Sequence, residues 1–154
     1  MKKRNFSARL ICALTLMTVL AACLHLGTLP VTAEETLRVC CGEMETSVAF
    51  SDLELTNITG QIVNGKGEVT EIDSDGLLLR DLLSACGIDP ENVASVTVTA
   101  SDEYSASVTG EELTSTDDVC LIRYEDGFRL VVFSDENSRR NVRDVVTIEA
   151  EPKQ

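Results

Sequence analysis

The side chains most suited to binding a charged ligand lie in the segment Ser138-Arg139-Arg140-Asn141-Val142-Arg143. It gathers three arginines in a chain whose formal net charge is −13. Planar guanidinium groups match phosphate and carboxylate, and a hydroxyl group adds a further donor. We therefore predict a weak anion site formed by Ser138, Arg139, Arg140 and Arg143. The alternative is that these arginines form ordinary surface salt bridges with the neighbouring acids, which are Asp135, Glu136 and Asp144.

A second group able to do chemistry is the set of cysteines that follows the first 33 residues: Cys40, Cys41, Cys86 and Cys120. An even number of cysteines in an oxidising compartment favours disulfides, and four cysteines allow three full pairings. Adjacent strand residues point to opposite faces, so Cys40 and Cys41 cannot both face Cys86. We predict one bridge, from Cys40 or Cys41 to Cys86 or Cys120, with buried free thiols as the alternative. The chain has no Cys-x-x-Cys spacing, which disfavours a redox or zinc site.

Acidic residues also occur in suggestive patterns. Residues 71–76 place acids and a glycine as in the first half of a calcium-binding loop, but the twelfth position is Leu82 instead of a bidentate glutamate. We interpret 71–76 as a solvated turn before a helix. The pairs Glu111-Glu112 and Asp117-Asp118 are better explained as solvated loop charge than as a catalytic carboxylate pair. No metal site is predicted.

The only histidine, His25, lies within the first 33 residues, and the chain has no tryptophan. Without a histidine in the remaining 121 residues, Ser-His and Cys-His nucleophile pairs and imidazole metal ligands are excluded there. Most hydrolase mechanisms are excluded with them.

Residues 1–33 have the pattern of an export signal. Four basic residues precede an uncharged run over 10–29, and small residues lead up to Ala33. We predict cleavage after Ala33 and export to the cell surface or the medium. Two alternatives remain open, which are lipidation at Cys23 and an uncleaved membrane anchor.

Residues 34–154 have a length that suits one small domain. They retain nine basic residues against 26 acidic ones, a net charge of −17. Nucleic acid and anionic membrane surfaces are polyanions, so this charge excludes them as partners. The acids serve solubility or, alternatively, an acidic docking surface for a cationic partner.

One helix, over 77–86, must organise this domain. Leu79, Leu82, Leu83 and Cys86 recur at helical spacing and form one apolar stripe. Gly87 stands where a left-handed residue ends a helix, and Pro90 prevents its continuation.

The remaining elements are mostly strands. Hydrophobic alternation and turn residues predict strands over 36–41, 46–50, 58–63, 68–72, 94–100, 104–108, 119–124, 128–133 and 143–150. We expect short helical turns near 51–54 and 110–113, a three-residue turn at 125–127 with a glycine bulge, and Val146 and Ile148 facing inward. The fold class is therefore α+β, a single small domain with a mainly antiparallel or mixed sheet and one principal helix.

Several short motifs follow one another in a recognisable order, VNGKG, GLLLRDLL, SDEYS, RLVV and VRDVVTIE, at 63–67, 76–83, 101–105, 129–132 and 142–149. Their order and spacing over 58–150 resemble the oxidoreductase molybdopterin-binding domain of the sulfite oxidase type, particularly its small exported members. The resemblance implies a mixed α+β fold and a molybdopterin cofactor. It also places Tyr104 at a family motif position, and the 138–143 segment near the pterin phosphate.

The family binds molybdenum through a cysteine thiolate that precedes the helix, whereas residues 55–74 of this chain contain no cysteine. The only similar pair is Cys41-Gly42, and Glu43 follows it. We therefore commit to no cofactor and no catalytic residue. The leading expectation is a non-catalytic, exported module that binds a small anion or a protein partner. The alternatives are an extracytoplasmic molybdopterin-dependent oxidoreductase with atypical ligands and a cell-surface adhesion module.

Overall fold

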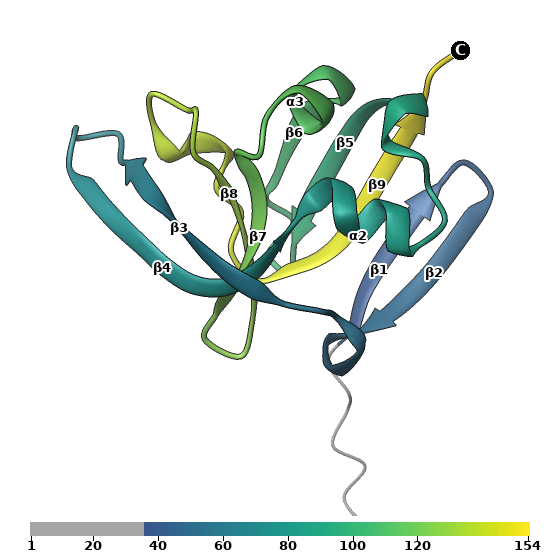
Figure 1. Cartoon of the computed structure of the whole chain (residues 1–154), viewed down its shortest axis with the longest axis horizontal. Coiled ribbons are helices and arrows are strands. Elements are labelled where there is room, and N and C mark those ends of the chain that lie inside the picture. Colours follow the sequence, from purple (N-terminus) through teal and green to yellow (C-terminus); the bar gives the residue numbers. More distant parts are fainter. Residues whose placement is uncertain (1–35) are drawn as a thin grey trace, which may run out of the picture. The chain divides into compact units, whose positions relative to one another are not determined.

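The computed structural model describes residues 36–154. The predictions for the first 33 residues, including Cys23 and His25, lie outside this part. The described chain forms two sheets and two α-helices (Figure 1). Their elements are β1 Thr36–Cys41, β2 Met44–Ala49, β3 Thr56–Val63, β4 Val69–Leu78, α2 Leu79–Ala85, β5 Val93–Ala100, β6 Ser105–Thr109, α3 Gly110–Ser115, β7 Val119–Tyr124, β8 Gly127–Val132 and β9 Val145–Pro152.

The first sheet has the order β2-β1-β9-β5-β6, and the second has the order β3-β4-β7-β8. Every neighbouring pair is antiparallel except β1 and β9, which run parallel. The α+β class and the mainly antiparallel, mixed sheet are confirmed. The strands predicted over 58–63 and 68–72, 94–100 and 104–108, and 119–124 and 128–133 pair as three antiparallel hairpins.

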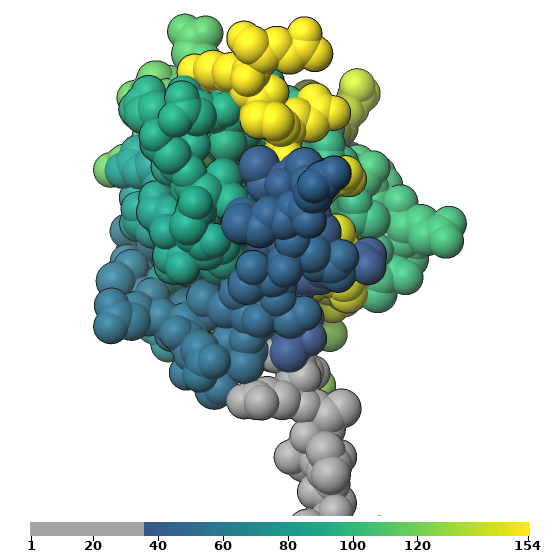
Figure 2. Space-filling model, turned by 90° about the vertical axis from the view of Figure 1, so that its right-hand side faces the viewer, coloured from purple at the N-terminus to yellow at the C-terminus, as the bar shows by residue number. Residues whose placement is uncertain are grey.

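The helix α2 packs its apolar face into the main core. Leu79, Leu82 and Leu83 are fully buried, and Gly87 has the left-handed φ of +80° expected after a helix end. Figure 2 shows the dark-blue β1–β2 hairpin beside the teal segment that contains α2. Burial of each leucine contributes about 1.5–3 kcal/mol, which a seven-residue helix needs because it is too short to be stable alone.

The helix begins two residues later than the predicted 77. Residues Gly76 to Leu78 instead continue β4 and pair with Cys120 to Ile122 of β7. The approach of the strands is close, since a Cβ atom on Gly76 would lie 2.4 Å from the Leu121 carbonyl oxygen. Residues 71–76 therefore lie within a strand, and our interpretation of them as a turn is wrong.

The second sheet buries side chains on both faces. One face joins the main core, and the other holds a smaller cluster made of Ile62, Ile72, Cys120, Ile122 and Val131. On this second face, the Phe133 ring lies so close to Gly60 that a Cβ atom there would come within 2.6 Å of it. Since β3 and β8 are the two outer strands, this contact shows that the sheet curls strongly.

Two local predictions are wrong. In β9, Ile148 is fully buried as predicted, but Val146 is 39% exposed and Val145 is buried in its stead. A register irregularity against β5 separates the Ala100–Val145 pair from the Thr99–Thr147 pair. The β7–β8 turn has two residues, with Glu125 at φ +52° and no left-handed glycine. The two short helical turns expected near 51–54 and 110–113 are present, as the 3-10 helix Phe50–Asp52 and the helix α3.

Candidate functional site

Arg140, from the predicted anion segment, is held by two carboxylates. Its Nε atom donates to Asp135 Oδ2 at 3.0 Å, its Nη2 atom also donates to Asp135, and its Nη1 atom donates to Glu112 Oε1 at 2.7 Å. The hydrogen bond to Asp135 is the main reason why the pKa of Arg140 is raised. The salt-bridge alternative is therefore confirmed for Arg140 and Asp135, and the acid Glu112 was not anticipated.

The other members of the segment do not converge with Arg140. The Arg143 guanidinium lies 5.2 Å from the centroid of the Tyr124 ring, a cation–π arrangement. The Tyr104 hydroxyl donates to the backbone carbonyl of Arg139. Within residues 36–154, the Arg139 side chain takes part in no recorded hydrogen bond or ion pair, and Ser138 is half-buried in a 3-10 helix. An anion site at Ser138, Arg139, Arg140, Arg143 and Tyr104 stays a prediction. Of its three arginines, only Arg139 has a side chain without a partner in the described residues.

The four cysteines of the described chain are free thiols, so the predicted bridge is absent. Cys120 lies on the second face of the four-stranded sheet, whereas Cys41 and Cys86 contact the main core on the other side. Burial raises the pKa of Cys86, and burial followed by nearby aspartates raises the pKa of Cys120 to about 11. Its Sγ atom donates to the Asp117 carbonyl at 3.4 Å.

These thiols do not fit the molybdenum ligand that the family resemblance implies. A metal ligand must be a thiolate, and the raised pKa values of Cys86 and Cys120 disfavour that form. Cys40 and Cys41 belong to β1, outside the 55–74 segment where the resemblance places the ligand cysteine. Within the described residues, no three metal-ligating side chains come together.

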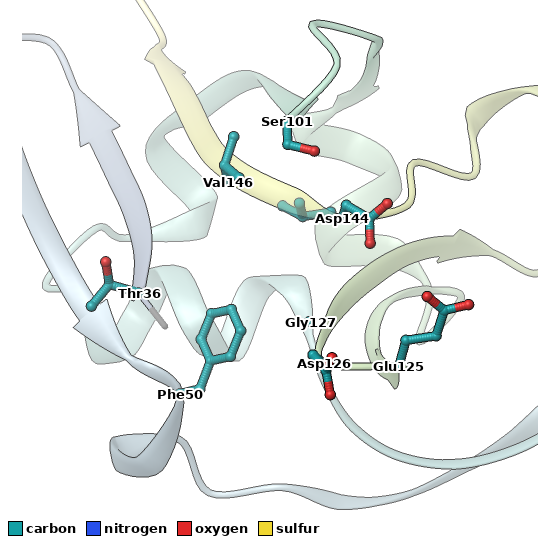
Figure 3. A pocket seen from close by; sticks show the side chains of 9 residues that line it. Thr36, Phe50, Ser101, Glu125, Asp126, Gly127, Asp144 and Val146 are labelled. Atoms are coloured by element: carbon teal, nitrogen blue, oxygen red, sulfur yellow. The ribbon is translucent and has the colours of Figure 1, made fainter. Parts of the chain in front are cut away.

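A pocket of about 310 Å³ opens between the start of β1, the β7–β8 turn and the start of β9. Its apolar lining includes Phe50, Val145 and Val146. Three carboxylates also line it, those of Glu125, Asp126 and Asp144. Figure 3 shows the acids on one side of the pocket, with Phe50 and Thr36 on the opposite side.

Backbone conformation places two of these acids. Glu125 and Asp144 have φ of +52° and +51°, values that cost energy for residues with a Cβ atom. Asp144 is fixed because its carbonyl accepts a hydrogen bond from Ser101 N at 3.0 Å. Phe50 is held by an edge-to-face contact with the buried ring of Phe128, at 4.7 Å between centroids.

The pocket acids are available for a ligand. In the described part of the chain, no ion pair or hydrogen bond is recorded for the side chains of Glu125, Asp126 or Asp144. Neither Lys, Arg, His nor Cys lines the pocket. Carboxylates around an aromatic and aliphatic surface attract a cation that carries an apolar body.

Sequence reasoning missed this pocket. It treated Asp144 only as a partner for arginines, and it treated Glu125 and Asp126 only as turn residues. The residues come from separate turns, so no spacing along the chain reveals their proximity.

Comparison with protein-family models finds no match to this chain, and comparison with curated proteins finds none either. Over residues 36–154, no helix has the length and hydrophobicity needed to cross a membrane.

Proposed function

We propose that this protein is a small exported binding module without catalytic activity, and that its ligand is an organic cation or a basic side chain of a partner. The observation that carries the proposal is the pocket whose lining combines three acidic residues, none with a side-chain partner in the described residues, with the apolar side chains of Phe50, Val145 and Val146. For the finer fold, we propose the molybdopterin-binding-domain architecture, which is supported by the order of the sequence motifs alone.

The donor set of the pocket supports binding over catalysis. Ser101 and Thr36 supply hydroxyl groups there, but no histidine or lysine lines the pocket, and in the described structure neither hydroxyl is hydrogen-bonded to a pocket carboxylate that could accept its proton. The carboxylates supply negative charge, and Phe50 supplies a ring face or edge for an apolar body. Attraction between exposed charges is weak at physiological salt, so we expect millimolar affinity for a minimal ligand.

A titration of full-length protein with phenethylammonium tests this proposal, with neutral 2-phenylethanol as the matched probe. Nuclear magnetic resonance shifts should map phenethylammonium to Phe50 and Asp126, and binding should weaken as sodium chloride rises. The double variant Asp126→Asn/Asp144→Asn should bind at least tenfold more weakly.

The control variant, Glu43→Gln/Glu149→Gln, removes the same charge from exposed positions away from the pocket. It should bind phenethylammonium like the wild type. Equal binding of the neutral alcohol, or equal losses in both double variants, would show that the pocket does not select cations.

A further inference from the structure

The strand β3 forms an open edge of the four-stranded sheet. The opposite outer strand, β8, is covered, because Leu130 N donates to the Val142 carbonyl at 2.8 Å and Val132 N donates to Asn141 Oδ1 at 3.2 Å. For β3, the described chain shows no backbone hydrogen bond to any segment other than β4. Alternate N–H and C=O groups of an outer strand point away from its neighbour.

The β3 edge lacks the residues that usually prevent an outer strand from pairing with another chain. All eight residues of β3, TNITGQIV, are uncharged, and none is proline. Natural edge strands are commonly blocked by charged side chains, prolines or bulges. By contrast, β2, an outer strand of the other sheet, carries Glu45, which approaches Arg38. The composition of β3 is therefore suited to accepting another strand.

A groove of about 570 Å³ runs along β3 on the second face of the sheet. Residues 56–60 form one side, and apolar atoms of Leu78, Cys120 and Phe133 contribute to the lining. Asp81, Asp117 and Asp118 also line it. An added strand would direct every second side chain toward this apolar surface.

The other face of the β3–β4 pair is acidic. Asn57 Nδ2 donates to Asp73 Oδ1 at 2.8 Å, and Gln61 Nε2 donates to Glu71 Oε1 at 2.7 Å. Because both amide nitrogens face carboxylates, the amide oxygens remain as acceptors for a neighbouring strand. Long cationic side chains on an added strand would lie on the same face as this acidic row.

We propose that β3 binds an extended partner segment in which apolar and basic residues alternate, adding it as a fifth strand of this sheet. The apolar residues enter the groove, and the lysine or arginine residues lie over Asp73 and Glu71. A second copy of this chain fits less well, because it would bring the same acids beside their counterparts. This inference uses none of the pocket residues of the proposed function.

The test uses full-length protein and a capped octapeptide in which valine and lysine alternate. Two control peptides are a block peptide of four valines followed by four lysines and an alternating valine–glutamate peptide. Titration followed by nuclear magnetic resonance should show at least tenfold tighter binding of the alternating lysine peptide. Amide hydrogens of β3 should exchange more slowly when this peptide is bound.

Matched variants locate the site. Thr59→Lys places a positive charge on β3 opposite Asp73 and should weaken binding at least tenfold. Ser47→Lys places the same charge on the exposed outer strand β2 and should leave binding unchanged. Unchanged thermal melting of both variants shows that the fold is intact.

Three outcomes would overturn the proposal: no binding of the alternating lysine peptide, equal binding of the block peptide, or equal effects of the two lysine substitutions. Concentration-dependent self-association in sedimentation experiments, abolished by Thr59→Lys, would assign the edge to a second copy and would also overturn it.

Discussion

Replacing Gly110 with alanine tests how tightly α3 is held against β5. Gly110 is the first residue of α3 and is buried, and a Cβ atom there would lie 1.9 Å from the Val93 carbonyl oxygen. Contacts of a real Cβ atom essentially never fall below 3.0 Å, so the helix and the strand would have to separate by roughly 1 Å. The atom met is backbone, and it cannot rotate away as a side chain would.

We expect Gly110→Ala to destabilise the protein, although helix propensity alone would predict stabilisation. Alanine favours a helix over glycine by about 1 kcal/mol and also restricts the unfolded chain. Forced overpacking of a well-packed site costs about 1–3 kcal/mol, occasionally more, and here it also strains a backbone contact. We expect Gly110→Ala to lower the free energy of unfolding by about 2 kcal/mol, which corresponds to a Tm decrease on the order of 10 °C for a domain of this size.

Thermal and urea unfolding followed by circular dichroism measure the effect. Gly127→Ala is the matched control, because a Cβ atom there meets nothing within 4 Å and the residue is not left-handed. The control should stay within about 0.5 kcal/mol of the wild type. If Gly110→Ala melts at or above the wild-type temperature, the contact between α3 and Val93 is not as close as described.

Three further predictions concern the core, the thiols and the partly buried ion pairs of Arg140. Leu83→Asp should abolish cooperative unfolding, because it places an unpaired carboxylate at a fully buried position; a melt unchanged within one or two degrees would contradict this. Titration of denatured, unreduced protein should find that all four cysteines of residues 36–154 are free thiols, whereas the sequence alone predicted two free thiols. In native protein, Cys120 should react most slowly, because it is 1% exposed and its pKa is raised to about 11. Arg140→Gln should destabilise by about 1–2 kcal/mol at neutral pH, a value reduced for partial exposure. Desolvation raises the pKa of Glu112, but hydrogen bonds from Thr109 and Arg140 lower it by more, so its stabilising effect is present above its ordinary pKa and is lost as the pH falls through the lowered value. As the pH falls through that acidic range, the free energy of unfolding of Arg140→Gln should therefore decrease less than that of the wild type. Parallel pH profiles of the two proteins would contradict the coupling between Arg140 and Glu112.

The elements that sequence predicted correctly are those with a local signal. The leucine stripe of α2 and the alternation of Val96 and Val98 in β5 follow directly from the periods of helix and strand. The start of α2 was predicted wrongly because Leu77 and Leu78 suit either element, and only pairing with β7 extends β4 through them. The exposure of Val146 depends on a register irregularity that the residue types do not predict.

The candidate sites depend on long-range placement and were not predictable in the same way. The arginine segment attracted attention because its charges are adjacent in sequence. Arg140 pairs with the nearby Asp135, as the salt-bridge alternative held, and also with Glu112, which lies 28 residues earlier. Glu112 also caps α3 by accepting from Thr109 N at 2.8 Å. Arg140 therefore connects the loop after β8 to the start of α3, which is a structural role that local charge density cannot reveal.

This placement of charge decides which partners suit the surface. The most basic segment is occupied internally, through Arg140 with Asp135 and Glu112, whereas the acids of the pocket and of the β3–β4 face remain turned outward. Both proposals therefore predict cationic partners, although they depend on different residues. Asp126→Asn/Asp144→Asn should weaken phenethylammonium binding without affecting the alternating peptide, and Thr59→Lys should do the reverse. Loss of both activities in either variant would indicate a general electrostatic attraction to the −17 domain instead of two defined sites.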